Sequence, residues 1–401
     1  MKIDDKTSHN SPSLRFPEFT GEWEKCVLGD YGKVVTGNTP PTKDIENYEN
    51  GTYLWASPAD LGTHKLISET KTKLSSKGFT KTRPLSKGSV LVTCIGSTIG
   101  KTGMATREMS TNQQINSIVV NENNDNEFVY YVVQSAFPHY LSSIAVQAVP
   151  IISKSSFELL PSKRPSLQEQ NKIGKFLSLL DERISTQHRL IEDLKKFKCA
   201  IVENVLNNRH PRMIRLGDIG SYIRGLTYSS NDVVEQNGTF IMRSNNIVNG
   251  CSLDYYNDVV SVNKRISKEQ MLQNGDIIIC MANGCSALVG KSSFYDGKCP
   301  RSITVGAFCG IYRSEEPIVK WLFQTNRYRR YIWNSLQGGN GAIANLNGED
   351  ILRMSFPIPD APVKNNCVKL LTSVDFMIEN ATSLCVLYTS QKEYLLRQMF
   401  I

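Results

Sequence analysis

Two glycine-rich stretches of the sequence end in Gly-Lys followed by a hydroxyl-bearing residue, which is how a phosphate-binding P-loop ends. They are IGSTIGKTG at 95–103 and GCSALVGKS at 284–292. A P-loop places four residues between its first Gly and the Gly-Lys pair, so that consecutive backbone N–H groups surround the phosphates. Three residues separate Gly96 from Gly100, and five separate Gly284 from Gly290. One copy is therefore too short and the other too long for nucleotide hydrolysis.

The remaining reactive side chains form no pattern typical of a catalytic or metal site. No nucleophile or carboxylate arrangement surrounds any of the five His, and the ten Cys include no CxxC pair. The glycine cluster GGNG at 338–341 follows no predicted strand, and no Asn-Pro-Pro-Tyr motif of an adenine methyltransferase occurs. We therefore expect no catalytic residue, no metal and no cofactor bound by this chain. His188 is expected at the surface, beside a helix seam.

Composition is that of an ordinary globular protein with a mildly basic balance. Of 401 residues, 40% are hydrophobic and 21% charged, and the formal net charge is +8. This charge permits an anionic partner such as DNA without requiring one. The N-terminus lacks an apolar signal-peptide core, and no apolar run approaches the roughly eighteen residues of a membrane span. The expectation is a cytoplasmic protein without a membrane partner.

The Gly-Lys stretches belong to a repeat that covers the chain. LGDYGKVVTG at 28–37 matches LGDIGSYIRG at 216–225, and NGTYLWAS at 50–57 matches NGTFIMRS at 237–244. Within each repeat the first part is strand-rich, with short apolar runs such as SVLVTCI and DIIICMA after glycine turns. The second part is a long helical segment. A period of about 190 residues makes each repeat a domain with an appendage and excludes a short-repeat solenoid.

The two long helical segments, 166–207 and 360–401, carry heptad patterns typical of a coiled coil. Ser166 and Glu169 fit a capping box at the start of the first, and Asp360 is a candidate cap for the second. Both copies place a Lys, 198 or 392, at the same seam position. Antiparallel pairing is the simpler solution, because parallel pairing would crowd both strand-rich domains at one end. In the first helix one predicted seam position holds Leu177, Ile184, Ile191, Lys198 and Val205, and the other holds Ile173, Leu180, Gln187, Leu194 and Ile201. In the second helix the equivalent positions hold Leu371, Ile378, Cys385, Lys392 and Met399, and Cys367, Val374, Ala381, Tyr388 and Leu395.

The chain resembles the specificity subunit of type I restriction-modification systems over nearly its whole length. The resemblance rests on LRFPEF at 14–19, on Trp23 with the Leu-Gly-Asp entry at 28–30 and its copy at 216–218, and on the first Gly-Lys turn. NQQINSIVV at 112–120 and SLQEQNKIGKFLSLLDERI at 166–184 also match. The second helix, which opens DAPVKNNCVKL at 360–370, departs from the Glu-Gln opening of the first.

This resemblance implies an α+β fold in which a tandem pseudo-symmetric repeat holds two target-recognition domains separated by two long helices that form an antiparallel coiled coil. The expected parts are a lead-in (1–22), recognition domain 1 (23–165), helix 1 (166–210), recognition domain 2 (211–359) and helix 2 (360–401). Each domain would read half of a bipartite double-stranded DNA site, and the helices would set the spacer. Two methyltransferase subunits, which carry S-adenosylmethionine, and restriction-translocase subunits would be the protein partners.

Residues for DNA contact are predicted from polar turns, since Arg, Lys, Asn, Gln, Ser and Thr can reach base edges or phosphates. The two sets differ in side-chain type, which predicts an asymmetric target. In the first domain they are Asn38, Thr39, Lys43, Ser57, Ser97, Thr98, Lys101, Gln113, Gln114 and Asn116. In the second they are Arg224, Tyr228, Arg243, Ser244, Asn245, Asn246, Asn283, Lys291 and Arg301.

Two functional alternatives stay open at this point: a P-loop-like nucleotide hydrolase that uses the Gly-Lys turns, and a bivalent coiled-coil rod that binds RNA or protein. NRYRRYIW at 326–333 also has two interpretations. Its interleaved Arg and aromatic residues suit nucleic acid, and its counterpart SAFPHYLS at 135–142 has no Arg or Lys. A helix with a buried aromatic face (Tyr328, Tyr331) and an exposed Arg face fits the same letters.

Overall fold

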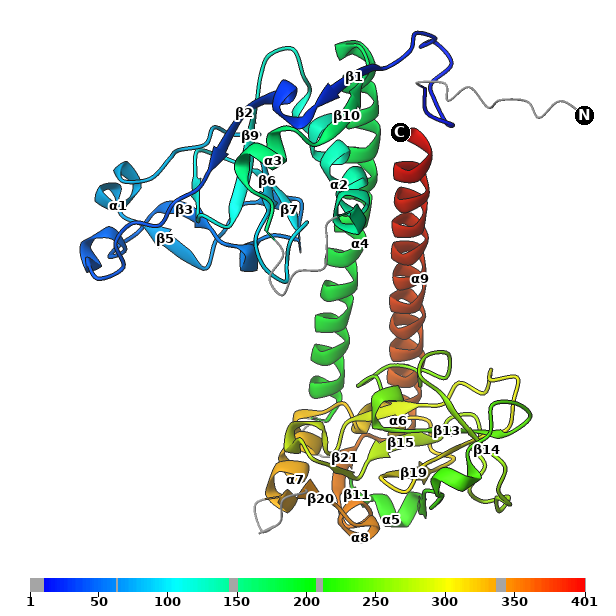
Figure 1. Ribbon diagram of the computed structural model, residues 1–401. Helices are drawn as coiled ribbons and strands as arrows, with labels where there is room; N and C mark the ends of the chain where they lie inside the picture. The colour runs from blue at the N-terminus through cyan, green and yellow to red at the C-terminus, as the bar shows by residue number, and fades with distance from the viewer. Residues whose placement is uncertain (1–10, 63, 144–150, 207–211, 337–343, 401) are drawn as a thin grey trace, which may run out of the picture. The chain divides into compact units, whose positions relative to one another are not determined.

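A computed structural model describes residues 11–62, 64–143, 151–206, 212–336 and 344–400. The GGNG stretch at 338–341 and the end of the expected first helix, 207–210, lie outside the described residues. The chain divides into two compact units: Met1–Arg189 with Thr382–Ile401, and Leu190–Ala381. Two long helices, α4 (Leu167–Leu206) and α9 (Ala361–Met399), each contribute a segment to both units (Figure 1).

The first unit is built on a five-stranded sheet and a three-stranded sheet. The larger has the order β2-β9-β6-β7-β4 and the smaller β5-β3-β8, while β1 pairs with β10. The bounds are β1 Glu24–Val27, β2 Gly32–Thr36, β3 Tyr53–Ala56, β4 Leu66–Ile67, β5 Thr72–Leu74, β6 Val90–Thr93, β7 Thr102–Ala105, β8 Ser110–Thr111, β9 Ile115–Val120 and β10 Pro161–Arg164, with helices α1 Ser76–Thr80, α2 Asn126–Ser143 and α3 Lys154–Glu158.

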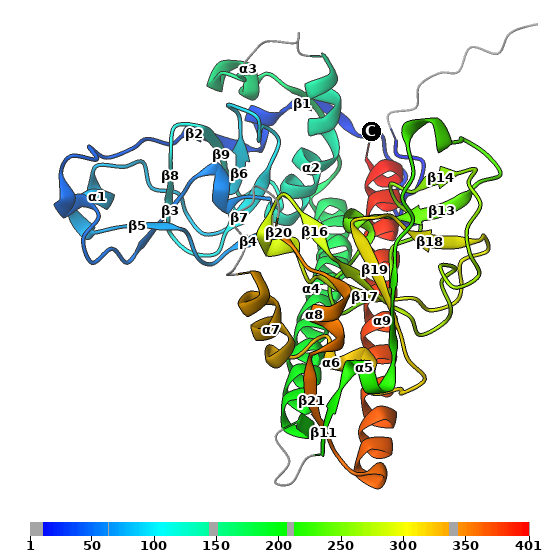
Figure 2. The same cartoon turned by 90° about the horizontal axis from the view of Figure 1, so that it is seen from below.

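The second unit repeats this plan, which confirms the duplication seen in the sequence. Its sheets have the orders β12-β19-β15-β17 and β14-β13-β18, β11 pairs with β21, and a further pair joins β16 and β20 (Figure 2). The bounds are β11 Arg212–Arg215, β12 Ser221–Arg224, β13 Thr239–Met242, β14 Val260–Val262, β15 Ile277–Cys280, β16 Ala282–Asn283, β17 Ser292–Phe294, β18 Ile303–Val305, β19 Cys309–Arg313, β20 Ala344–Asn345 and β21 Ser355–Ile358, with helices α5 Leu216–Ile219, α6 Val319–Leu322, α7 Asn326–Leu336 and α8 Gly348–Leu352.

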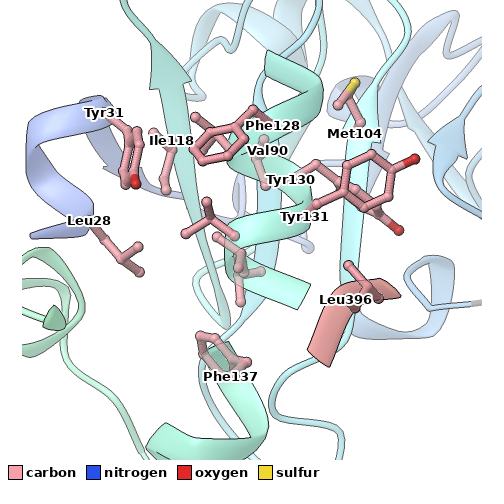
Figure 3. Packing of buried hydrophobic residues seen from close by; sticks show 14 of the residues in the cluster. Leu28, Tyr31, Val90, Met104, Ile118, Phe128, Tyr130, Tyr131, Phe137 and Leu396 are labelled. Atoms are coloured by element: carbon pink, nitrogen blue, oxygen red, sulfur yellow. The ribbon is translucent and has the colours of Figure 1, made fainter. Parts of the chain in front are cut away.

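In the first unit the core lies between the larger sheet, α2 and the long helices. Figure 3 shows Phe128, Tyr131 and Phe137 of α2 among side chains of the strands, with Leu396 of α9 at the same cluster. The central strand β6 is buried on both faces, because α2 covers one side and the smaller hydrophobic cluster around Leu91 fills the other. Burying such side chains contributes about 25 cal/mol per Å² of apolar surface.

The heptad prediction is confirmed, and the two long helices pair antiparallel. In the first unit Ile173 and Leu177 of α4 share a core with Met399 of α9, whereas in the second Val202 of α4 shares a core with Leu371. The beginning of each helix therefore meets the end of the other. Every predicted seam residue whose burial is described is buried or half-buried.

Ionic pairs occupy the seam where the sequence places Lys in a hydrophobic pattern. Lys392 of α9 donates to Asp181 of α4 at 2.7 Å in the first unit, and Lys198 of α4 lies 2.7 Å from Asp375 of α9 in the second. Asp181 and Asp375 are repeat-equivalent positions, as are the two Lys. The step from Asp181 to Lys198 along α4 equals the step from Lys392 back to Asp375 along α9, so both pairs obey one antiparallel register.

Each recognition unit adds a second Lys to its aspartate. Lys65, in the loop before β4, lies 3.9 Å from Asp181, and the Tyr131 hydroxyl donates to the same carboxylate at 2.5 Å. In the second unit Lys320 lies 2.7 Å from Asp375, and the Trp321 indole donates to it at 3.1 Å. The strand-rich part of each unit is thereby tied to the paired helices through one carboxylate.

The capping-box prediction at the start of α4 is half right. The Glu169 backbone N–H donates to the Ser166 hydroxyl oxygen at 3.4 Å, but the Glu169 carboxylate accepts two bonds of 2.7 Å from the Arg15 guanidinium. The Trp23 indole donates to it as well. A bidentate charged pair is stronger than a single bond to a backbone N–H, which explains the difference. Asp360 precedes α9, where its backbone carbonyl accepts from Lys364.

By length and composition alone, α9 is apolar enough to cross a membrane. An eighteen-residue window reaches a mean hydropathy of 1.3, and 28% of that window is buried. The sequence predicts no membrane span, because no uninterrupted apolar run is long enough. In α9, Ser, Thr and Asn residues lie between the apolar ones, so only the average hydropathy of the window is high. The core helix of a soluble protein passes the same test, and α9 bears Asp375 at a buried ionic contact.

Candidate nucleic-acid interface

In the first unit most of the predicted contact residues gather at one edge of the sheets. The loop after β2 faces the turn between β8 and β9, because Gly37 and Asn38 donate their backbone N–H groups to Ile115 and Thr111. The turn after β6 joins them through the bond from Cys94 N–H to the Gln114 carbonyl at 2.8 Å. Ends of β2, β3 and β6 and the start of β9 thus present their polar turns together.

Several of these side chains bond to one another and hold the edge in shape. Thr39 donates to the Gln113 side chain at 2.5 Å, and the Asn38 amide bridges the Lys81 carbonyl and the Arg83 N–H. Ser57 donates to Asp60. Asn116 is buried, where it accepts from the Thr36 hydroxyl at 2.6 Å. Lys43 lies farther along its loop, exposed, and Ser97, Lys101 and Gln113 are also exposed.

The second unit gathers the equivalent turns. Asn283 donates to the Ser244 hydroxyl at 3.3 Å, Arg243 lies 3.2 Å from Asp258, and Asn245 donates to the same Asp258 at 2.6 Å. Asn246 is buried and donates to a backbone carbonyl. Arg224 is exposed, Tyr228 is half-buried, and the main chain of Lys291 accepts from Cys280.

Arg301 lies apart from this group. It lies two residues before the start of β18, and its guanidinium stacks over the Phe240 ring at 5.1 Å. Phe240 is near the start of β13, which runs parallel to β18, whereas Arg243 follows the end of β13. Arg301 is therefore at the opposite end of the smaller sheet. Because β13 is only four residues long, aligning the turns of the two repeats could not indicate at which of its ends Arg301 lies.

Two residues at these edges escaped the sequence analysis. Arg83 donates to the Thr36 carbonyl at 2.8 Å and braces the loop after β2. Phe308 is exposed in the turn before β19, where its carbonyl accepts from the backbones of Met281 and Ala282. Each position has a counterpart in the other repeat: Gln270 donates to the Arg224 carbonyl, and the Gln114 carbonyl accepts from the Cys94 N–H. The paired residues differ in side-chain type, so the repeat signal alone did not indicate Arg83 and Phe308.

The Gly-Lys turns cannot act as phosphate nests. In the first, the N–H groups of Ile99, Gly100 and Lys101 donate to carbonyls of the same hairpin, so they do not point toward a ligand. The turn joins β6 to the antiparallel β7, whereas a P-loop opens a helix. The second turn bonds in the same way, from Gly290 to Cys280 and from Lys291 to Leu288. The nucleotide-hydrolase alternative therefore loses its structural basis.

The described thiols and acidic groups offer no catalytic centre. Burial raises the pKa of Cys94 and of Cys309 to about 12, so both stay protonated at neutral pH. Within the described ranges no three His, Cys, Asp or Glu residues could together hold a metal ion. His188 is exposed, as predicted, with its Nε2 atom 3.4 Å from the Cys385 sulfur.

Residues 20–196 match the model of the type I restriction modification DNA specificity domain. Among curated proteins, the MjaIX specificity subunit of Methanocaldococcus jannaschii is 28% identical over 189 residues, which are 46% of this chain and 43% of that protein. The EcoKI specificity subunit of Escherichia coli is 32% identical over 149 residues, 35% of this chain and 31% of that protein. The chain thus aligns with less than half the length of these relatives. The MjaVIII specificity subunit is 22% identical over 91% of this chain and 88% of its own length.

Solved structures share the fold along almost the whole chain. The type I restriction-modification S subunit from M. genitalium matches with a TM-score of 0.65 at 15% identity, covering 98% of this chain and 99% of its own. A chain from a study of complex assembly in the type I system matches with a TM-score of 0.51 at 16% identity, covering 93% and 96%.

Fold and site together define a tandem protein in which two copies of one strand-rich unit each gather polar turns at a sheet edge and attach to paired antiparallel helices. Residues 20–196 are a type I restriction modification DNA specificity domain, and the whole chain shares the fold of a type I specificity subunit.

Proposed function

We propose that this chain is the sequence-specific DNA-binding subunit of a type I restriction-modification complex, without catalytic activity of its own. The observation that carries the proposal is the repeated edge of polar turns, one per unit. Residues 23–165 and 211–359 would each read one half of a bipartite double-stranded site. Since the two edges present different side chains, Lys and Gln in one and Arg and Asn in the other, the two half-sites differ.

Within each edge the exposed side chains are assigned to DNA and the buried ones to positioning. The exposed side chains are Ser97, Lys101 and Gln113 in the first unit and Arg224 and Asn245 in the second, and we assign them to base edges or phosphates. Gln113 and Asn245 are also held by bonds with Thr39 and Asp258. Asn116 and Asn246 fix the turns from below. The role is supported by geometry, because ends of neighbouring strands present side chains over a surface that a major groove, about 12 Å wide, can accept.

We further propose that α4 and α9 bear two methyltransferase subunits and set the spacer between half-sites. Their solvent side carries large apolar residues that no described residue covers, among them Phe197 on α4 and Phe376, Val386 and Leu387 on α9. Exposed apolar patches of this kind are typical of protein interfaces. S-adenosylmethionine would bind to the methyltransferases, and restriction-translocase subunits would complete a cytoplasmic complex.

Exchange of residues 23–165 for those of a family member with another specificity tests the two-reader model. The methylated site, found by methylation-aware sequencing of cells that carry the chain and its methyltransferase, should change in one half only. A site unchanged in both halves, or changed in both, contradicts the proposal. Removing one heptad from both α4 and α9 should shorten the spacer or abolish binding, and an unchanged spacer excludes the spacer role.

The alternatives are separated by two simpler measurements. A nucleotide hydrolase should turn over ATP with Mg²⁺ and lose that turnover in Lys101→Ala, whereas the specificity subunit should show none. A bivalent RNA-binding rod should prefer structured RNA to duplex DNA in competition. Preference for duplex DNA supports the proposal.

A further inference from the structure

A hollow of about 640 Å³ lies in the second unit between α7 and the turn that carries Lys291. Its floor is apolar, formed by Val289, Tyr328 and Ile332, which are all buried. This volume is within the range of pockets that hold small ligands, about 300–1,000 Å³. The stretch NRYRRYIW forms the α7 wall of this hollow. Its interleaved Arg and aromatic residues have no role in the proposed function, and here they line a surface.

The rim of the hollow carries an aromatic ring and two cations. Trp333 lines it with 67% of its surface exposed, while Trp23 and Trp321 are buried in the cores. Lys291 and Arg329 also line it, and neither has an acidic partner at ion-pair distance among the residues that the structure describes. An exposed indole beside unpaired cations is the combination with which proteins bind single-stranded nucleic acid, through base stacking and phosphate contact.

The α7 helix orients this surface through its own packing. Tyr328 is buried and donates to the Gly290 carbonyl at 2.7 Å, and Ile332 packs against Gly290 itself. Arg329 and Trp333 each follow one of these buried residues by a single position, so the two lie on the neighbouring face of the helix. They are four residues apart and therefore lie side by side. The helix is thus fixed to the Gly-Lys turn, and the arginine and the indole have a defined place beside Lys291.

The first unit supplies a natural contrast. Its Gly-Lys turn packs on α2 in the same manner, with Gly100 against Phe137. No Arg or Lys occurs within α2, from Asn126 to Ser143. The equivalent of the positively charged wall is therefore missing from α2, although Lys101 stands where Lys291 does.

We propose that this hollow binds one unpaired nucleotide of a single-stranded DNA segment. The base would stack on Trp333 over the apolar floor, and its phosphates would lie at Lys291 and Arg329. The inference rests on the proposed function in one respect: the turn that ends at Lys291 begins beside Asn283, at the predicted recognition edge, so a strand bound there lies next to the hollow. Side-chain cations, and no backbone nest, hold the phosphate.

The test measures binding of a fluorescein-labelled 12-nucleotide single-stranded DNA to the full chain by anisotropy, with Trp emission as a second signal. Trp333→Ala should weaken binding about 5- to 150-fold, because stacking on an aromatic side chain contributes on the order of 1–3 kcal/mol per base. Trp333→Tyr should retain most of it. Lys291→Ala and Arg329→Ala should each lower the slope of log K against log salt by about 0.7.

Lys87→Ala, at an exposed lysine of the first unit outside the recognition edge, is the control and should leave single-strand binding unchanged. Far-UV circular dichroism should show the same helix content in every variant. Binding of AMP at this site without binding of the oligonucleotide would overturn the strand as occupant, and oligonucleotide affinity unchanged in Trp333→Ala would overturn the site. A duplex assay on the recognition edges reads out separately, so failure of this inference and failure of the proposed function give different results.

Discussion

Loss of the single charge of Asp375 should strongly destabilise the second unit. Its side chain is about nine-tenths buried and lies 2.7 Å from Lys198, 2.7 Å from Lys320 and 3.1 Å from the Trp321 indole nitrogen. In Asp375→Asn the shape and the acceptor for the indole persist, but two ammonium groups lose their common counter-charge. Breaking a buried ion pair from one side costs about 3–5 kcal/mol.

Because Lys320 keeps partial access to water, we expect a loss at the lower end of that range, about 3 kcal/mol, for Asp375→Asn. Asp375→Ala should lose about 1 kcal/mol more, since the indole N–H is then unpaired as well. With a urea m-value of about 2 kcal/mol/M, the transition of the second unit should move by about 1.5 M. Urea unfolding followed by circular dichroism and Trp emission measures this shift.

The matched variant is Asp181→Asn, in the equivalent position of the first unit. Its cost should be smaller, because Lys65 also pairs with Glu127 and so keeps a counter-charge. A double-mutant cycle of Asp375→Asn with Lys198→Met should show coupling above about 1 kcal/mol. If Asp375→Asn shifts the free energy of unfolding by less than about 0.5 kcal/mol, or if the cycle is additive, the reasoning is refuted.

Three further predictions follow from contacts elsewhere in the chain. Glu169→Gln should cost about 3 kcal/mol in urea unfolding, because the buried carboxylate pairs with Arg15, while Glu18→Gln in the exposed pair with Lys172 should leave the urea transition unchanged; equal effects would contradict this. Gly290→Ala should cost about 2 kcal/mol, since φ is +80° and a Cβ would stand 2.7 Å from Ile332, whereas Gly284→Ala, with nothing within 4 Å, should be neutral. At pH 8 a thiol reagent should label Cys199 and Cys285 quickly and Cys94 and Cys309 only after unfolding. The buried thiols have a folded-state pKa of about 12, above the unfolded value of 9.0. Their contribution to the free energy of unfolding is therefore fully present below pH 9 and is lost as the pH rises toward 12. A free energy of unfolding that increases over this interval would contradict the prediction.

The sequence was most informative where one physical rule acts along one segment. Heptad spacing identified the seam of both helices, because burial on a helix follows a fixed period regardless of the partner. The duplication likewise predicted that each strand-rich part would fold in the same way, and the sheet orders agree.

Where a side chain chooses between partners far apart in the chain, the sequence could not decide. The Glu169 carboxylate binds Arg15 instead of its own helix end. Lys198 pairs with Asp375 because of the register between the two helices, which no local sequence pattern indicates. Most of the polar turns chosen for DNA contact lie together at one end of the strands, whereas Arg301 lies at the opposite end of β13 and β18. Which exposed side chains read bases stays a prediction, since that depends on a ligand's position.

The seam aspartates and lysines have a consequence for how the two repeats can change over time. Each repeat carries one acid and one base, and each finds its opposite in the other repeat. A repeat is therefore electrically matched to any second repeat that keeps these two positions, whatever its turns present to DNA. Sequence divergence at the recognition edges is free of the constraint that holds the helices, and exchange of an entire repeat preserves both ion pairs.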